Sequence, residues 1–237
     1  MEMYAIDGTK ITIQEFITMY GNSYYTDQPK YVSRATQSSR FTENEIDRLI
    51  SDGIKDPIDV VHILAWKLGK INHNKSNTAF VYAKDWENAE QFDVLRYKKA
   101  FDIRTISEYI ADNISGLEAE AKNNPQKVLC ELRNLNVDGI GTVYLITLLY
   151  FISRGEYPIY DRFAMMSVQA ILNNQKPGEI VIVKELPEKS SSKFNRVFEE
   201  KMNPFIENLK TIFGETYKEN RDIDRALWVY GHCFRNK

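Results

Sequence analysis

The stretch from Leu135 to Asp161, LNVDGIGTVYLITLLYFISRGEYPIYD, limits the possible folds of this chain more than any other. Gly139 and Gly141 lie close together, and glycine permits both a positive φ and a close approach of the backbone to a partner. A helix is expected to begin at Thr142 or Val143, and from Val143 to Ile152 only Thr147 is neither apolar nor aromatic. Such a helix is buried on all sides, so other helices must surround it. It is too short for a membrane span, which takes about 20 apolar residues.

Both ends of this stretch carry groups that can bind a ligand. The first N–H groups of the expected helix have no helical acceptor and point outward. Such a helix N-terminus is an anion site that can bind a phosphate. After the turn that contains Gly155 and Pro158, Asp161 stands where the N-cap of the next helix belongs. The alternative for the hairpin (residues 135–141) is an ordinary tight turn between two helices.

The order of these residues resembles the helix-hairpin-helix DNA glycosylases, the relatives of endonuclease III and 8-oxoguanine DNA glycosylase. The resemblance rests on the pattern Leu135-x-Val137-x-Gly139-Ile140-Gly141 and on an acid, Asp161, that follows Gly139 by 22 residues behind a proline-containing turn. In that family the hairpin binds duplex DNA through one phosphate, and the acid at the position of Asp161 is catalytic. The motif covers about 27 residues, Leu135 to Asp161.

The resemblance implies two sets of backbone groups in the hairpin. The N–H groups that would bind the phosphate belong to Gly139, Gly141 and Val143. The carbonyl groups that would hold a monovalent cation, bridging to the phosphate, belong to Leu135, Val137 and Ile140. Members of the family that also nick the strand carry a lysine where this chain has Val143. Valine cannot form a Schiff base, so the resemblance implies the monofunctional branch or a protein that has lost catalysis.

Asp161 is the candidate catalytic residue. Hydrolysis of an N-glycosidic bond passes through a sugar with oxocarbenium character, and a nearby carboxylate stabilises that charge and orients or deprotonates the attacking water. A helix N-terminus favours the ionised carboxylate. The alternative is that Asp161 is only an N-cap, worth about 1 kcal/mol of stability.

Charge and cysteine content narrow the partners and cofactors. The net charge is −2, but residues 1–121 carry 14 basic and 19 acidic side chains while residues 122–237 carry 17 and 14. DNA binding requires only a local basic surface, so the total charge does not decide the matter. Cys130 and Cys233 are too few for the four-cysteine iron–sulfur cluster of some family members, and the three histidines lack metal-ligand spacing. We expect no cofactor apart from the hairpin cation.

Helix signals recur along the chain, and they predict an all-α fold with one small β-ribbon insertion at 179–186. Capping boxes are expected at Thr42-x-x-Glu45 and Ser115-x-x-Glu118. The expected helices cover 42–53, 57–69, 78–97 (continuous or broken near Asp85), 104–114, 116–123, 125 to the hairpin, 163–172, 194–213 with a kink allowed by Pro204, and 222–234. We expect two helical lobes, 42–153 ending in the helix-hairpin-helix, and 1–41 with 154–237 completing the cleft.

These observations predict a DNA glycosylase-like hydrolase of DNA repair that excises a damaged or modified base from double-stranded DNA. In the family that this chain resembles, a polar residue fills the gap left by the extruded base. Asn72 or Asn74 could take this role, or the segment that contains them is a plain polar turn. The rivals are a non-catalytic helix-hairpin-helix DNA-binding module and a helical protein–protein adaptor. Without a signal peptide or membrane span, we expect a cytoplasmic monomer, nucleoid-associated if prokaryotic.

Overall fold

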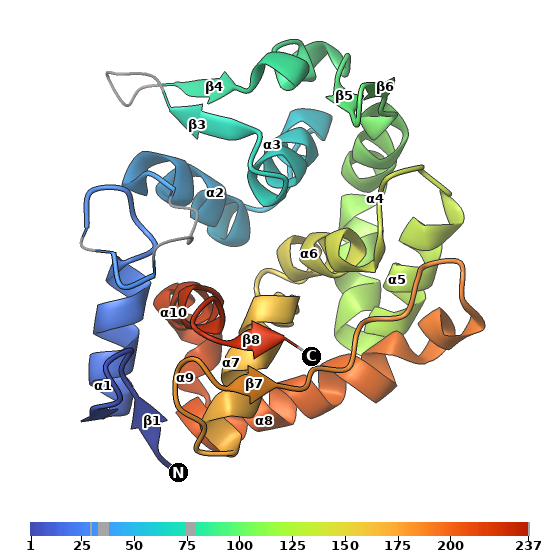
Figure 1. The fold of residues 1–237 in the computed structure, drawn as a ribbon. Coiled ribbons are helices and arrows are strands. Elements are labelled where there is room, and N and C mark those ends of the chain that lie inside the picture. Colours follow the sequence, from blue (N-terminus) through green and yellow to red (C-terminus); the bar gives the residue numbers. More distant parts are fainter. Residues whose placement is uncertain (29, 33–37, 74–78, 237) are drawn as a thin grey trace. The chain divides into compact units, whose positions relative to one another are not determined.

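The computed structural model describes residues 1–28, 30–32, 38–73 and 79–236, and in these ranges the chain is mostly helical with a few short strand pairs (Figure 1). It divides into two compact units. Unit 1 comprises residues 1–38, 158–186 and 199–237, and unit 2 comprises residues 39–157 and 187–198. The lobes expected from the sequence were 42–153, and 1–41 with 154–237. That expectation grouped residues 187–198 with the second of these lobes, whereas they belong to unit 2 with the hairpin.

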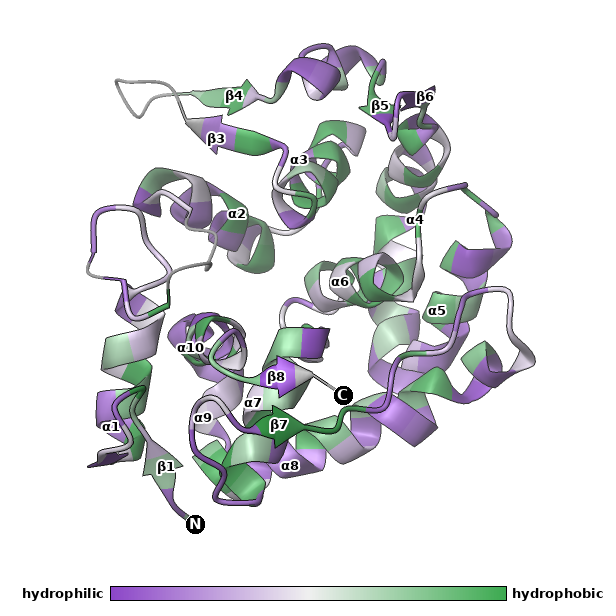
Figure 2. Cartoon of the chain, viewed as in Figure 1, coloured by the Kyte–Doolittle hydropathy of each residue, from purple (hydrophilic) through white to green (hydrophobic). Residues whose placement is uncertain are grey.

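Unit 2 contains the hairpin and the helices that surround it. These are α2 (Arg40–Asp52), α3 (Pro57–Lys67), α4 (Ile103–Asn123), α5 (Pro125–Asn134) and α6 (Thr142–Ile152). Helix α6 contacts α3, α4 and α5, and every residue of α6 from Leu145 to Ile152 is buried. Figure 2 colours this helix mainly green and white. The apolar helix predicted after the glycines is therefore the central element of unit 2.

Unit 1 packs around the last helix of the chain. It contains α1 (Ile13–Phe16) continuing into a π-helical turn (Ile17–Gly21), α7 (Arg162–Leu172), α8 (Asn203–Phe213), α9 (Thr216–Glu219) and α10 (Arg221–Gly231). Helix α10 contacts α7 and the π-helical turn. Gly231 makes the first contact possible, because a Cβ there would lie 2.2 Å from the carbonyl oxygen of Phe163.

The strands of the described residues are short. Three pairs are antiparallel: β1 (Met3–Tyr4) with β2 (Lys10–Ile11), β3 (Ile71–His73) with β4 (Phe80–Tyr82), and β5 (Leu95–Arg96) with β6 (Lys99–Ala100). The fourth pair is parallel and joins β7 (Ile180–Val181) to β8 (Arg235–Asn236). Strand β7 lies inside the segment predicted as a β-ribbon.

The two predicted capping boxes are wrong. Ser39, not Thr42, caps α2, and its hydroxyl accepts from the N–H of Thr42 at 3.0 Å. Ser115 lies in the middle of α4, which runs unbroken where two helices were expected. The buried residues Ile106, Ile110, Leu117 and Ala121 follow one helical stripe across this serine. Burial of a continuous stripe outweighs a local capping signal.

The expected helix over 78–97 is also wrong. Its described residues form β4, β5 and two 3₁₀ turns (Lys84–Trp86 and Ala89–Gln91). Phe92 and Tyr97 have φ of 62° and 52°, which no α-helix permits. Asn72 lies in β3 and not in a plain turn, while Asn74 lies outside the described residues.

The predicted helix over 194–213 is shorter than expected. Residues Ser192–Arg196 form a 3₁₀ turn, Phe198–Met202 form a π-helical turn, and α8 begins only at Asn203. Pro204 lies in the first turn of α8, where its missing N–H costs nothing, so it starts the helix and does not kink it.

Candidate functional site

The hairpin joins α5 to α6 through a turn anchored by two apolar side chains. Val137 and Ile140 are buried, whereas Asp138 and Gly139 between them are exposed. Gly139 has a φ of +81°, a conformation that glycine adopts without strain. The turn therefore holds its apolar residues inward and presents its backbone at Gly139 outward.

The N-terminus of α6 faces open space. Gly141 is the N-cap residue, with a φ of −95°, and no side chain caps this end. The first helical hydrogen bonds are donated by Tyr144 and Leu145 to the Gly141 carbonyl, at 3.0 and 3.2 Å. The N–H groups of Thr142 and Val143 come before these bonds and have no helical acceptor. A Cβ built on Gly141 would meet no atom within 4 Å, so a ligand can approach the backbone directly.

Arg96, at the end of β5, holds the outer side of the hairpin. Its guanidinium donates to the carbonyl oxygen of Gly139 and, at 3.1 Å, to the Tyr144 hydroxyl. It also lies 4.8 Å from the centre of the Tyr144 ring. The turn that follows exposes an aromatic ring and two ammonium groups, because Tyr97 is 84% exposed and Lys98 and Lys99 are exposed beside it. Basic side chains thus accompany the hairpin on this side.

The segment 187–198 lines the inner side of the hairpin. Thr142 at the start of α6 donates its hydroxyl to the Pro187 carbonyl at 2.5 Å. The Lys189 ammonium donates to the Val137 carbonyl, also at 2.5 Å. Burial lowers the pKa of Lys189, and the carboxylate of Asp138 opposes that effect. One of the three carbonyls expected to bind a cation therefore already accepts from a lysine.

A polar pocket of about 500 Å³ lies where this segment meets α5 and the hairpin. Arg133, Asn136, Lys189 and Asn195 line it, together with the serines at 190–192. Arg133 donates to the side-chain oxygen of Asn195 at 2.6 Å. Two basic side chains and three hydroxyl groups make this pocket suitable for an anion.

Asp161 lies in unit 1 and is the N-cap of α7. Its carboxylate accepts from the N–H of Ala164 at 2.9 Å, and the residue has the extended backbone usual for an N-cap. The capping position that the sequence predicted is confirmed. Asp161 is half-buried.

Three half-buried aromatic side chains gather at the same end of α7. The His232 ring stacks on Phe163, with ring centres 3.6 Å apart and planes inclined by 16°, and it lies 4.4 Å from the Trp228 ring. One ring nitrogen of His232, Nδ1, lies 2.8 Å from the Trp228 carbonyl. Because a carbonyl can only accept, Nδ1 carries the proton and Nε2 is left as an acceptor. Burial lowers the pKa of His232, while the Trp228 carbonyl and the Asp161 charge act in the opposite direction.

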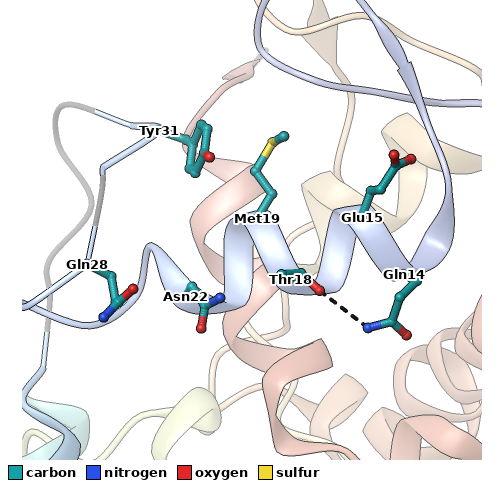
Figure 3. Close-up of a pocket in the computed structure, with 7 residues that line it drawn as sticks. All are labelled: Gln14, Glu15, Thr18, Met19, Asn22, Gln28 and Tyr31. Carbon is teal, nitrogen blue, oxygen red and sulfur yellow. Dashed lines mark hydrogen bonds between the residues drawn. The ribbon is translucent and has the colours of Figure 1, made fainter.

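A second pocket, of about 400 Å³, belongs to unit 1 and lies beside α1 and its π-helical continuation (Figure 3). Met19 and Tyr31 contribute its apolar surface, and the side chains of Gln14, Asn22 and Gln28 contribute amides. Among the described residues that line this pocket, the one carboxylate is that of Glu15, which accepts from the backbone N–H and hydroxyl of Thr12; both lower its pKa. Because this carboxylate is already engaged, we assign the pocket no part in the chemistry.

The structure brings the hairpin residues together and adds three that sequence reasoning missed. Leu135, Val137, Gly139, Ile140, Gly141 and Val143 all belong to the single turn and helix start described above. Arg96, Lys189 and His232 were not predicted. Arg96 and Lys189 lie far along the chain from the carbonyls they contact, and His232 lies far from Phe163, on which it stacks, so no local pattern marks these pairings. Lys189 could have been suspected only as a lysine in an irregular basic segment.

Comparison with known proteins supplies no relative. No family model, curated protein or solved structure matches this chain. Within the described residues, no group of three or more histidine, cysteine or acidic side chains is placed to hold a metal ion. In the same residues, no helix combines the length and apolar character that crossing a bilayer requires.

Proposed function

We propose that this protein binds duplex DNA through the hairpin and hydrolyses the N-glycosidic bond of a damaged or modified base. The observation that carries the proposal is the open N-terminus of α6. There, a glycine N-cap with free space around it precedes two N–H groups that have no helical acceptor. Partial positive charge at a helix N-terminus favours a phosphate.

The side chains around this terminus support a nucleic-acid partner. Lys98 and Lys99 are exposed in the turn that follows Arg96, which contacts the hairpin, and Arg133 lines the polar pocket. Such side chains position a DNA backbone without reading its sequence. Tyr97, almost fully exposed at the tip of the β5–β6 turn, offers a ring for stacking on a base.

In the proposed reaction, Asp161 is the catalytic residue. The C1′–N bond breaks and its electron pair leaves with the base, while the oxygen of a water molecule bonds to C1′. The Asp161 carboxylate stabilises the positive charge on the sugar and takes a proton from that water, and the departing base is protonated in turn. The base must first leave the stack, at a cost of a few kcal/mol. The aromatic surface of Phe163 and Trp228 lies at the same end of α7 and suits a flat ring.

Val143, the second residue of α6, determines which product we expect from the reaction. Without an amine there, no covalent sugar intermediate forms at this position. The expected product is therefore an abasic site in an unbroken strand.

The test is base release from duplexes that carry oxidised, alkylated, deaminated or hypermodified bases, using the wild type and Asp161→Asn. The amide keeps an oxygen that can cap α7, so the variant separates loss of chemistry from loss of folding. Release by the wild type alone, with strand nicks only after alkali, is the expected result. Nicking without alkali would refute the monofunctional assignment.

A non-catalytic DNA-binding module is the second candidate, because the contact of Asp161 within α7 is that of an ordinary N-cap. This candidate predicts salt-dependent DNA binding, through release of counterions from phosphates, with no base released. A protein–protein adaptor predicts neither. DNA affinity at several salt concentrations, measured beside base release, distinguishes the three.

A further inference from the structure

The cation expected from the glycosylase resemblance does not fit the hairpin of this chain. The expected ligands are the carbonyls of Leu135, Val137 and Ile140. The Val137 carbonyl accepts from the N–H of Ile140 at 3.3 Å and from the Lys189 ammonium at 2.5 Å. A carbonyl oxygen has two lone pairs, so both are used. A metal ion at this oxygen would have to share it with a positive charge already in place.

Lys189 is held in this position by its own segment. Two residues earlier, the Pro187 carbonyl accepts from the buried hydroxyl of Thr142, at the first residue of α6. A few residues later, Phe194 and Val197 are fully buried. The amide of Gln126 on α5 donates to the Phe194 carbonyl at 3.0 Å. The segment is therefore fastened on both sides of the lysine.

A lysine side chain is ordinarily charged at neutral pH. The ordinary lysine pKa of about 10.4 lies more than three units above neutrality. Burial lowers the pKa of Lys189, but the Asp138 carboxylate, on the hairpin itself, favours the charged form. An ammonium bound to this carbonyl places one positive charge beside the phosphate-binding turn.

We propose that the Lys189 side chain replaces the monovalent cation of the hairpin, as a cation tethered to the chain itself. The inference rests on the proposed function, because it assigns the hairpin to a DNA phosphate. Its consequence is a DNA affinity that depends on ionic strength but not on which monovalent cation supplies it.

The experiment measures DNA binding by fluorescence anisotropy in KCl, NaCl and tetramethylammonium chloride at equal ionic strength. Tetramethylammonium is too large to be coordinated by the turn. The wild type should bind equally, within twofold, in all three salts. Lys189→Met should bind about tenfold more weakly in tetramethylammonium and regain most of that loss in K⁺ or Na⁺. Lys193→Met is the matched control, since Lys193 is exposed on the same segment, and it should show no cation preference.

A thermal melt without DNA in the same salts gives an independent measurement. The wild type should melt at one temperature in all three salts, whereas Lys189→Met should melt higher in K⁺ or Na⁺ than in tetramethylammonium. If methionine prevents folding, Lys189→Ala frees the same lone pair of the Val137 carbonyl with a smaller side chain and should show the same preference.

Two results would overturn the inference: a wild type that requires K⁺ or Na⁺ specifically, or Lys189 variants that behave as Lys193→Met does. If none of the proteins binds DNA in any salt, the proposed function fails. The melts then still decide whether Lys189 occupies the cation position.

Discussion

Two glycine substitutions in the hairpin should separate folding from DNA binding. Gly139 and Gly141 are both replaced by alanine, one at a time. At Gly139, φ is +81° and the new Cβ would lie 3.2 Å from atoms of both Arg96 and Phe101. At Gly141, φ is −95° and the new Cβ would meet nothing within 4 Å. The first site is constrained by the fold, and the second is constrained only by what approaches from outside.

The expected stabilities follow from these surroundings. Alanine at Gly139 takes a left-handed conformation at a cost of about 1–2 kcal/mol, which lowers the melting temperature by about 2–8 °C for a chain of this size. Alanine at Gly141 reduces the entropy of the unfolded chain, a gain of about 0.4–1 kcal/mol. Alanine is a poorer N-cap than glycine by a similar amount, about 0.5–1 kcal/mol. The free energy of unfolding of Gly141→Ala should therefore stay close to that of the wild type.

DNA affinity should respond to the substitution that leaves stability unchanged, Gly141→Ala. A methyl group on Gly141 fills part of the open space beside the α6 N-terminus, from which a phosphate is proposed to approach the N–H groups of Thr142 and Val143. Hydrogen bonds to a charged group are worth about 1.5–3 kcal/mol, so binding should weaken by about tenfold or more. Urea unfolding and anisotropy on one duplex measure the two quantities. A fully stable Gly141→Ala protein that binds DNA as the wild type does would refute the assignment of the α6 N-terminus as the phosphate site.

Three further predictions concern other parts of the molecule. Gly231→Ala should cost stability at the upper end of about 1–3 kcal/mol, measured by urea unfolding, because its Cβ would lie 2.2 Å from the Phe163 carbonyl oxygen; an unchanged midpoint would contradict the close packing of α10 on α7. Removing Lys98 and Lys99 together should reduce the slope of log affinity against log salt by roughly 1.8 if each contacts one phosphate, and an unchanged slope would place the DNA elsewhere. The folded-state pKa of His232 is lowered by burial, so the contribution of this residue to stability is present above the unfolded pKa of about 6.5 and is lost as pH falls through the lower folded value. His232→Gln should therefore lessen the fall in melting temperature between pH 7 and pH 5. An identical fall in both proteins would contradict the burial of the neutral ring.

The stretch around the hairpin was predictable because its signals are local and agree with one another. Gly141 ends a turn, an apolar run follows, and Asp161 precedes a second helix, so α6 and α7 begin at Thr142 and Arg162. Asp56 caps α3 with Pro57 in the first turn, also as expected. In each case one residue satisfies backbone groups next to it, with no help from distant parts of the chain.

The failures share the opposite property. Ser39 takes the N-cap position of α2 in place of Thr42, and Ser115 lies inside a longer helix because continuing α4 buries a continuous apolar stripe. The contacts of Lys189 and Arg96 with the hairpin carbonyls join residues separated by 52 and 43 positions. Neither contact leaves a period or spacing in the sequence. Such pairings exist only after the chain has folded, so a single sequence does not reveal them.

The position of segment 187–198 in the chain affects when unit 2 can be completed during synthesis. The chain passes from unit 1 into unit 2 after residue 38, returns after 157, enters unit 2 again after 186 and leaves it after 198. During synthesis, the hairpin and its helices emerge well before Lys189, Phe194 and Val197. Until those residues arrive, the Val137 carbonyl has no ammonium, and α5 lacks its contacts with the 3₁₀ turn Ser192–Arg196. A nascent chain that stops before residue 187 therefore carries the hairpin but lacks the Lys189 ammonium and the buried side chains of Phe194 and Val197.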